Sequence, residues 1–391
     1  MGRFYDSRFT IHDSRIYDCI DSFLPISILT YMEKIKELEG IVELSHQNRP
    51  GVWIMPFVRE LGYYDLDFST FRKHDLQNGS RIKFTTNGNR IAEIISICDM
   101  KPEDYQYRKS KHKQTVISPN QRFDFGASQF PSLRVLDMLV PIGLGARALI
   151  ISPPRAGKTV FLEQLAIELG KKPEVDKLLV LLIDERPEEV TSFRRNTDAV
   201  VYHSDMDNKA ETHARLAELM LKNIELELEC GNNIVVLLDS LTRLSRATNQ
   251  DNRRSGSRIM SGGLGTNAMQ LPRKLLGQAR NLENGGSCTI IATILKDTGS
   301  RMDDIIFQEF KGTGNCEIVL DANLAYERIY PALDIRASGT RHEELLLAKD
   351  EYEKVQYLRR LLLKRTPQQA INDLLRMMEI HLTNKELLQT L

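Results

Sequence analysis

The stretch Ala148-Leu-Ile-Ile-Ser-Pro-Pro-Arg-Ala-Gly-Lys-Thr159, which continues through Val160 to Gly170, decides the fold of this 391-residue chain. An apolar run is followed by a turn segment and then by apolar residues at helical spacing, which stop at Gly170. That order predicts a strand, a loop and a helix, the context of a phosphate-binding loop. A chance Gly-Lys-Thr in a strand-to-helix connection is the alternative, and the flanking pattern argues against it.

Each polar position of this loop has a chemical reason. Gly157 lets the backbone approach a phosphate, and the loop amides and the positive end of the following helix surround the anion. Lys158 is placed to reach the β- and γ-phosphates, and the Thr159 hydroxyl is placed to coordinate Mg²⁺. Ser152 stands where the motif usually has its first glycine. We therefore expect ATP and Mg²⁺ to bind here.

The amino-acid composition limits which partners, disulfides and membrane segments the chain can have. Lys and Arg equal Asp and Glu at 53 each, so any basic surface that meets an anionic partner is local. The five cysteines are far apart and show neither metal-ligand spacing nor a disulfide framework. No apolar run reaches membrane-spanning length, and the N-terminus is too charged for a secretory signal. We expect a cytoplasmic protein of two or three domains without a membrane partner.

Residues 1–35 have no pattern that assigns them a function. From about residue 39, short strands are expected at 40–44, 51–55, 81–84 and 90–97, separated by turn residues. They predict a small all-β barrel of the OB type over residues 36–100. Its aromatic side chains either stack on nucleic-acid bases or fill the barrel interior; they are Trp53, Phe57, Tyr63, Tyr64, Phe68, Phe71 and Phe84.

Residues 101–130 have the composition of a linker. Its basic stretch Tyr105–Lys113 either contacts a nucleic-acid backbone or is simply solvated. From residue 131 to 391 the pattern is α/β, with nearly continuous apolar runs at 148–152, 178–183, 234–238 and 289–294. Such runs are typical of parallel strands buried on both faces, so we expect a doubly wound P-loop ATPase core whose site lies at the carboxyl ends of the strands.

Two carboxylates follow these strands. Glu185, at the end of the second run, is placed to orient a water for attack on a γ-phosphate. The alternative for Asp184-Glu185 is an acidic helix cap before Pro187. Asp239 ends the third run, where a carboxylate holds Mg²⁺ directly or through water.

Three polar segments complete the candidates. Residues 250–263 and 297–303 are Gly-rich, basic and expected at the same end of the sheet, where in a ring they would grip a polyanion; solvated surface loops are the alternative. Arg341, in Ser338-Gly-Thr-Arg341, is either an arginine finger that reaches a neighbour's γ-phosphate or an ordinary surface residue.

Several of these stretches together resemble the bacterial transcription termination factor Rho family. The matches are Arg134-Val-Leu-Asp137, Pro141-Ile-Gly-Leu-Gly145, Pro153–Thr159, Leu181–Val190, Leu238–Leu244, Asp297–Asp303, Glu309–Asn315 and Ser338–Leu345. They cover residues 133–350 almost continuously. The resemblance implies a RecA-like core behind an OB/cold-shock-like RNA-binding barrel. It further implies a homohexameric RNA-dependent ATPase and helicase that moves along single-stranded RNA and releases transcripts from RNA polymerase.

The resemblance also implies roles for individual residues. Glu185 becomes the general base, Asp239 the metal-side carboxylate and Arg341 the finger given across a subunit interface. The residues implied to contact ATP are Gly143, Leu144, Gly145, Ala146, Arg147, Ala148, Arg155, Ala156, Gly157, Lys158, Thr159, Val160, Arg186, Arg328 and Tyr330. Those implied to contact RNA are Arg301 and, in the other loop, Arg258, Ser261, Gly262 and Gly263.

Two departures from the family pattern stand out. The loop Ser255–Gly263 is one residue longer than the usual form, which leaves its register on RNA open. The barrel's base-stacking strand, Gly-aromatic-Gly-aromatic in the family, is Gly51-Val52-Trp53-Ile54 here, so its stacking surface is expected to be altered or lost. Two alternatives therefore remain, a ring ATPase not coupled to RNA and a non-catalytic RNA-binding relative. The retained Lys158, Glu185, Asp239 and Arg341 argue against the second.

Overall fold

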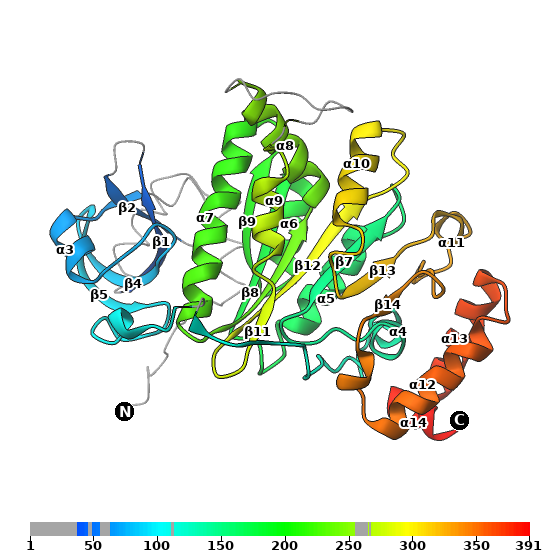
Figure 1. Cartoon of the computed structure of the whole chain (residues 1–391). Helices are drawn as coiled ribbons and strands as arrows, with labels where there is room; N and C mark the ends of the chain where they lie inside the picture. The colour runs from blue at the N-terminus through cyan, green and yellow to red at the C-terminus, as the bar shows by residue number, and fades with distance from the viewer. Residues whose placement is uncertain (1–36, 46–48, 55–62, 111–112, 255–264, 266) are drawn as a thin grey trace, which may run out of the picture.

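The computed structural model describes residues 37–45, 49–54, 63–110, 113–254, 265 and 267–391 (Figure 1). Four expectations fall outside these residues: the segment 1–35, Phe57, the end of the 250–263 loop, and the RNA contacts of Arg258, Ser261, Gly262 and Gly263. Among the described helices, none combines the length and the apolar character needed to cross a membrane.

The predicted barrel is present. Strands β1 (Leu38–Leu44), β2 (Pro50–Ile54), β3 (Tyr63–Asp65), β4 (Arg81–Asn87) and β5 (Arg90–Ile97) close in the order β1-β2-β3-β5-β4. A short helix, α3 (Phe68–Lys73), connects β3 to β4, and Asp67 caps it by accepting from the Thr70 amide. The two-residue turn between β4 and β5 requires Gly88, whose φ is +62°. Both β3 and α3 were missed in the sequence, because three residues are too few to show an alternating pattern and the six residues of α3 include no buried one that would show helical spacing.

The second body is the predicted α/β core. Its seven-strand path runs β14-β13-β7-β12-β10-β8-β9, and the six strands from β13 to β9 are parallel. Bounds of the strands are β7 (Arg147–Ser152), β8 (Lys177–Glu185), β9 (Val200–Asp205), β10 (Asn233–Asp239), β11 (Arg280–Leu282), β12 (Ser287–Leu295), β13 (Cys316–Val319) and β14 (Gly339–Thr340). The helices between them are α5 (Lys158–Leu169), α6 (Pro187–Asn196), α7 (Ala210–Glu229), α8 (Leu241–Arg254), α9 (Gln270–Leu276), α10 (Arg301–Phe310) and α11 (Ala322–Tyr326).

Both faces of this sheet are buried, which explains the continuous apolar runs. Along β7, Ala148 and Ile150 belong to one hydrophobic cluster, whereas Leu149 and Ile151 belong to the other. The first cluster includes α5 and α6, and the second includes α7 to α10. Buried against the first face are also α4 (Pro131–Leu139), α12 (Lys349–Leu362), α13 (Pro367–Ile380) and α14 (Asn384–Gln389), none of which the sequence pattern singled out.

The described residues of the segment 101–130 are anchored to both the barrel and the α/β core. Tyr105 is completely buried and its hydroxyl lies 3.1 Å from the Ser80 hydroxyl, while Phe123 and Phe125 are buried in the α/β core. A short strand, β6 (Val116–Ile117), pairs with β11 and so adds this segment to the edge of the sheet. The polar composition concealed these contacts because a few buried aromatic residues anchor an otherwise exposed segment.

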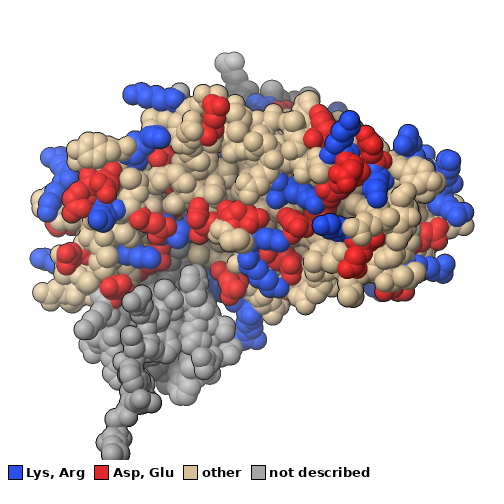
Figure 2. Space-filling model, turned by 90° about the horizontal axis from the view of Figure 1, so that it is seen from below, with Lys and Arg blue, Asp and Glu red and all other residues tan. Residues whose placement is uncertain are grey.

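The barrel packs beside α7 (Figure 1). Ile41 of β1 belongs to the hydrophobic cluster of α7, and Leu226 of α7 belongs to the cluster of the barrel. Seen from below, the described surface carries acidic and basic side chains side by side, with no extended patch of one sign on that face (Figure 2). This distribution agrees with the equal numbers of the two charges in the sequence.

Candidate active site

A cleft of about 820 Å³ opens at the carboxyl ends of the parallel strands. The phosphate-binding loop forms its floor, and β8, α8 and the segment after α11 supply its walls. Its polar and aromatic lining includes Arg155, Lys158, Thr159, Glu185, Arg186, Glu189, Arg243 and Tyr330. Seven of the predicted nucleotide-contacting residues at 155–160 and 186 therefore meet in one cavity, together with Tyr330.

The loop has the predicted backbone. Gly157 takes a φ of +87° immediately before α5, and Arg155 also lies in the left-handed region. A side chain at position 157 would also come within 3.3 Å of the Tyr330 ring. Glycine is therefore needed here both for its conformation and for the close approach of the aromatic ring. Tyr330 faces the loop, in a position to cover a base or ribose.

Lys158 lies between two acidic residues. Its ammonium group pairs with Asp239 Oδ2 and lies 3.9 Å from Glu185 Oε1. Asp239 is almost completely buried and also accepts a hydrogen bond of 2.8 Å from the Thr293 hydroxyl of β12. The lysine and the carboxylate at the end of the third apolar run are thus brought together across the strands β7 and β10.

Glu185 is the chemically most perturbed group in the cleft. A register shift between β8 and β9 around Asp184, which has a φ of +57°, turns Glu185 inward until only 2% of it is exposed. Burial, followed by repulsion from Asp239, raises the pKa of Glu185 to about 7. Its Oε1 atom lies 3.2 Å from Arg243 Nε, while the buried Oε2 atom has no hydrogen-bond partner among the described residues. Such a carboxylate is suited to accept a proton from a water near neutral pH.

The donor set fits a divalent cation. Carboxylate oxygens of Glu185, Glu189 and Asp239 lie within 4.8 Å of one another. The Thr159 hydroxyl donates a 3.1 Å hydrogen bond to Glu189 Oε2, so it lies at the edge of the same group. Hydroxyl and carboxylate oxygens are the ligands that Mg²⁺ prefers.

Other predicted nucleotide contacts do not line this cleft. Arg147 and its neighbours from Gly143 to Ala148 lie at the opposite, amino end of β7, and the side chains of Leu144, Ala146 and Ala148 are buried in the core. Arg341 is exposed at the same end, where its amide donates to the Asn315 carbonyl. Arg328 is exposed two residues before Tyr330 but is not part of the lining. Within one chain these residues and the phosphate-binding loop remain apart.

Of the predicted RNA contacts, Arg301 is described. It is exposed at the first position of α10, directly after the polar segment that follows β12. Asp303 fixes that segment: it pairs with Arg246 of α8 and accepts a 2.7 Å hydrogen bond from Thr298. Helix α8, whose last residues begin the predicted polar segment 250–263, is therefore tied to the helix that carries Arg301.

Two residues of the cleft were missed. Arg243 contacts both Glu185 and the backbone carbonyl of Asp184, and Glu189 bonds to Thr159. Each lies four residues beyond a predicted carboxylate, that is, one helical turn after the strand that ends at Asp239 or Glu185. This four-residue spacing is the sequence pattern from which Arg243 and Glu189 could have been predicted.

In the barrel, the altered motif Gly51-Val52-Trp53-Ile54 lies on β2. Val52 is completely buried in the barrel interior. Trp53 lies on the outer face, edge-on to Tyr63 with ring centroids 5.0 Å apart, and its indole N–H donates to Glu43. Phe84 is buried and Phe71 packs against the interior, whereas Phe68 is 47% exposed. Phe84 and Phe71 thus fill the barrel interior, one of the two expected roles, whereas base stacking by the outward-facing aromatic residues stays a prediction.

Comparison with known proteins identifies the domain and the relatives of the chain. Residues 132–340 match the ATP synthase alpha/beta family, nucleotide-binding domain. The chain is 45% identical over 302 residues to the transcription termination factor Rho of Akkermansia muciniphila, covering 76% of this chain and 63% of that protein. It is 44% identical over 284 residues to the Rho of Karelsulcia muelleri, covering 72% and 74% respectively.

A solved structure shows the same fold. The assembled ATPase EscN of the type III secretion system of enteropathogenic E. coli superposes with a TM-score of 0.59 at 18% identity, over 90% of this chain and 96% of that chain. The chain spans less than two thirds of the length of the Akkermansia relative. With most of the Karelsulcia protein covered at 44% identity, this chain belongs to the transcription termination factor Rho family.

Proposed function

We propose that this chain is an RNA-dependent ATPase that moves along single-stranded RNA as a homohexameric ring in the cytoplasm and promotes transcription termination at RNA polymerase. The observation that supports hydrolysis most directly is the Glu185 carboxylate. It is buried in the nucleotide cleft, its pKa is raised to about 7, and its Oε2 atom has no partner among the described residues.

The chain's own residues divide the work. Amides of the Gly157 loop and the Lys158 ammonium group bind the β- and γ-phosphates, and Tyr330 covers the base or ribose. Glu185 Oε2 accepts a proton from the attacking water, while Arg243 fixes the other oxygen of the same carboxylate. Thr159, Asp239 and Glu189 would hold Mg²⁺, which supplies charge neutralisation on the phosphate oxygens.

A neighbouring subunit completes the site in this proposal. Arg341 lies at the end of the sheet opposite its own phosphate-binding loop, so it acts on the nucleotide of another copy. RNA passes Arg301 and the predicted polar segment 250–263 at the centre of the ring. The tie between Arg246 of α8 and Asp303 of α10 supports a common movement of these two RNA contacts.

RNA-stimulated ATP hydrolysis tests the proposal. ATP turnover is measured for the full chain with no polymer, with single-stranded poly(C), poly(U) and poly(A), and with double-stranded RNA. We expect turnover to rise with at least one single-stranded RNA, and Arg301→Ala to reduce that rise while leaving turnover without RNA unchanged. Arg336→Ala, which removes another exposed arginine, is the matched control.

The alternative is a ring ATPase that is coupled to something other than RNA. The match to the ATP synthase alpha/beta nucleotide-binding domain favours the shared core but not a particular partner. ATP turnover that no RNA changes, in a preparation that hydrolyses ATP, would support this alternative and count against RNA coupling.

A further inference from the structure

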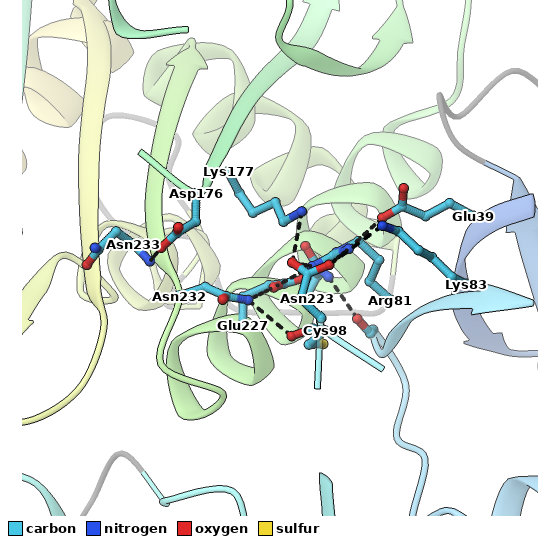
Figure 3. Close-up of polar contacts among 12 residues, drawn as sticks. Glu39, Arg81, Lys83, Cys98, Asp176, Lys177, Asn223, Glu227, Asn232 and Asn233 are labelled. Carbon is cyan, nitrogen blue, oxygen red and sulfur yellow. Dashed lines mark hydrogen bonds and ion pairs between the residues drawn. The ribbon is translucent and has the colours of Figure 1, made fainter. Parts of the chain in front are cut away.

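The junction between the barrel and the α/β core contains a buried ionic network (Figure 3). Arg81 of β4 is 3% exposed and contacts three carboxylates: Glu39 of β1, Asp99 after β5 and Glu227 of α7. The guanidinium-to-Glu227 contact is 2.6 Å and joins the two bodies directly. Because Glu227 is itself buried, separating the bodies would leave charges without partners, which is costly.

Further polar contacts hold the same junction. Lys177, at the start of β8, lies 2.9 Å from Asp99. Asn223 of α7 donates to the Gly79 carbonyl of the barrel at 3.0 Å. Asn232, just beyond α7, donates both to Glu227 at 2.5 Å and to the Cys98 carbonyl at 3.3 Å (Figure 3). The residues that end the barrel and those that end α7 are therefore held against each other.

Two free cysteines meet at this point. Cys98 follows β5, and its amide donates to the Arg81 carbonyl, so it belongs to the barrel. Cys230 ends α7, so it belongs to the α/β core. Cys98 is buried in the barrel's hydrophobic cluster, and Cys230 packs against that same cluster from the α/β core. Cys230 is partly exposed, so a reagent in solution can reach one member of the pair.

We propose that Cys98 and Cys230 are a redox-active pair whose disulfide fastens the barrel to α7 when a peroxide is present. Both cysteines lie at the barrel's hydrophobic cluster, and the contacts of Asn232 with the Cys98 carbonyl and of the Cys98 amide with Arg81 hold the two chain segments together there. A disulfide requires the two sulfur atoms to approach to about 2 Å.

The chemistry balances with hydrogen peroxide as the oxidant. The Cys230 thiol releases its proton and the thiolate attacks one peroxide oxygen. The O–O bond breaks, and the departing hydroxide takes up a proton in place of the one released, which gives a sulfenic acid at Cys230 and one water. The Cys98 sulfur then attacks the Cys230 sulfur, and the S–O bond breaks. Hydroxide leaves and takes the Cys98 proton as a second water. Two thiols lose two electrons, and one peroxide is reduced to two waters.

The other cysteines of the described residues provide an internal comparison. Cys288 and Cys316 are both buried, and they belong to the clusters on opposite faces of the parallel sheet. The sheet itself separates them, so neither is expected to form a disulfide while the chain is folded. Cys19 lies outside the described residues, and its pairing with Cys230 is a distinct outcome that the experiment can detect.

The test oxidises the folded full-length chain with hydrogen peroxide, blocks remaining thiols with an alkylating reagent, and maps linked peptides by mass spectrometry. We expect a peptide pair that joins Cys98 to Cys230 with the loss of two hydrogen atoms. Protease cleavage between the two cysteines should release the barrel only after dithiothreitol is added. The oxidised chain should also melt at a higher temperature than the reduced chain, because the bond closes a long loop.

Variants make the result decisive without relying on ATPase activity. Cys230→Ser should abolish the linked peptides and the dithiothreitol-dependent release, whereas Cys19→Ser should leave both unchanged. The proposal is overturned if Cys230 is oxidised to sulfinic acid while Cys98 stays reduced, or if the dominant linked pair joins Cys230 to Cys19. It is equally overturned if both thiols remain unmodified at peroxide concentrations that oxidise the unfolded chain.

Discussion

The two ends of the parallel sheet carry opposite chemistry. At the carboxyl end, the phosphate-binding loop faces the buried carboxylates Glu185 and Asp239. At the amino end, Arg147 lies close enough to Arg280 and Arg341 that burial and their positive charges lower its pKa. Within the described part of the chain, no carboxylate pairs with any of these three arginines, and Arg147 Nε is buried without a hydrogen bond.

The opposite charges at the two ends of the sheet indicate how the proposed nucleotide site is divided between two chains. The strand β7 separates the two ends, and its six residues span roughly 20 Å at about 3.3 Å per residue. Arg341 therefore cannot reach the phosphates bound by its own chain. An acidic, lysine-bearing half-site at one end and an arginine half-site at the other are complementary in charge, and in the proposed ring of identical chains they would meet at each interface.

The largest effect is expected from the carboxyl end. Lys158→Ala removes the ammonium group that binds phosphate, and the side chain is not part of the hydrophobic core. We expect ATP hydrolysis to disappear while the thermal unfolding transition is retained. Turnover and circular dichroism on the same preparation check this prediction, and appreciable hydrolysis by a pure Lys158→Ala protein would contradict the site.

Arg341→Ala removes an arginine side chain at the amino end of the sheet and leaves the carboxyl end unchanged. A finger acts on charge that develops in the neighbour's site, so nucleotide affinity should stay nearly unchanged while turnover falls by about 10³–10⁵. Equilibrium binding of a fluorescent ATP analogue, measured beside steady-state turnover, separates the two effects. Arg336→Ala serves as the control on a nearby exposed arginine, and equal losses in the two variants would remove the special role of Arg341.

The role of Glu185 at the carboxyl end can be tested by substitution and by the pH dependence of ATP turnover. Glu185→Gln should keep nucleotide binding and lose roughly 10²–10⁴ in turnover, since it removes the proton acceptor. In the unchanged chain, activity should rise as pH passes through about 7, where the carboxylate ionises. Near wild-type turnover in Glu185→Gln would show that another group accepts the proton.

The raised pKa of Glu185 also makes the free energy of unfolding depend on pH. The pKa of Glu185 is higher in the folded chain than the ordinary value of 4.5, so its contribution to stability is fully present below pH 4.5 and is lost as pH rises through about 7. Glu185→Gln should therefore be more stable than the unchanged chain at pH 8, by roughly 1–3 kcal/mol, and gain little near pH 5. Urea unfolding at the two pH values measures the difference.

The smallest effect is expected in the barrel. Val52 points inward, and Trp53 is engaged by Glu43 and Tyr63, so we expect base stacking at this strand to contribute little to RNA affinity. Trp53→Ala in the full chain should weaken single-stranded RNA binding by less than about 1 kcal/mol, below the ~1–3 kcal/mol of a base-stacking residue. A larger and pyrimidine-selective loss would place an RNA site on the outer face of the barrel.

The sequence predicted the carboxyl end of the sheet better than the amino end or the barrel. Lys158, Glu185 and Asp239 each follow an apolar run, and parallel strands bring such positions together at one edge. The nucleotide contact of Arg147 was implied by the resemblance, although its place directly before the apolar run 148–152 puts it at the amino end of β7. Tyr105 and the junction at Arg81 were also missed, since their partners lie far away in the sequence.

Mixed rings test the division of the site between two chains most directly. Lys158→Ala and Arg341→Ala proteins are combined, allowed to exchange subunits, and compared with each variant alone at equal total concentration. We predict partial recovery of ATP turnover, because an Arg341→Ala chain supplies an intact phosphate-binding loop next to a Lys158→Ala chain that supplies the arginine. If subunits exchange, as labelled chains would show, and turnover still equals the sum of the two inactive variants, the shared site between the two ends of the sheet is contradicted.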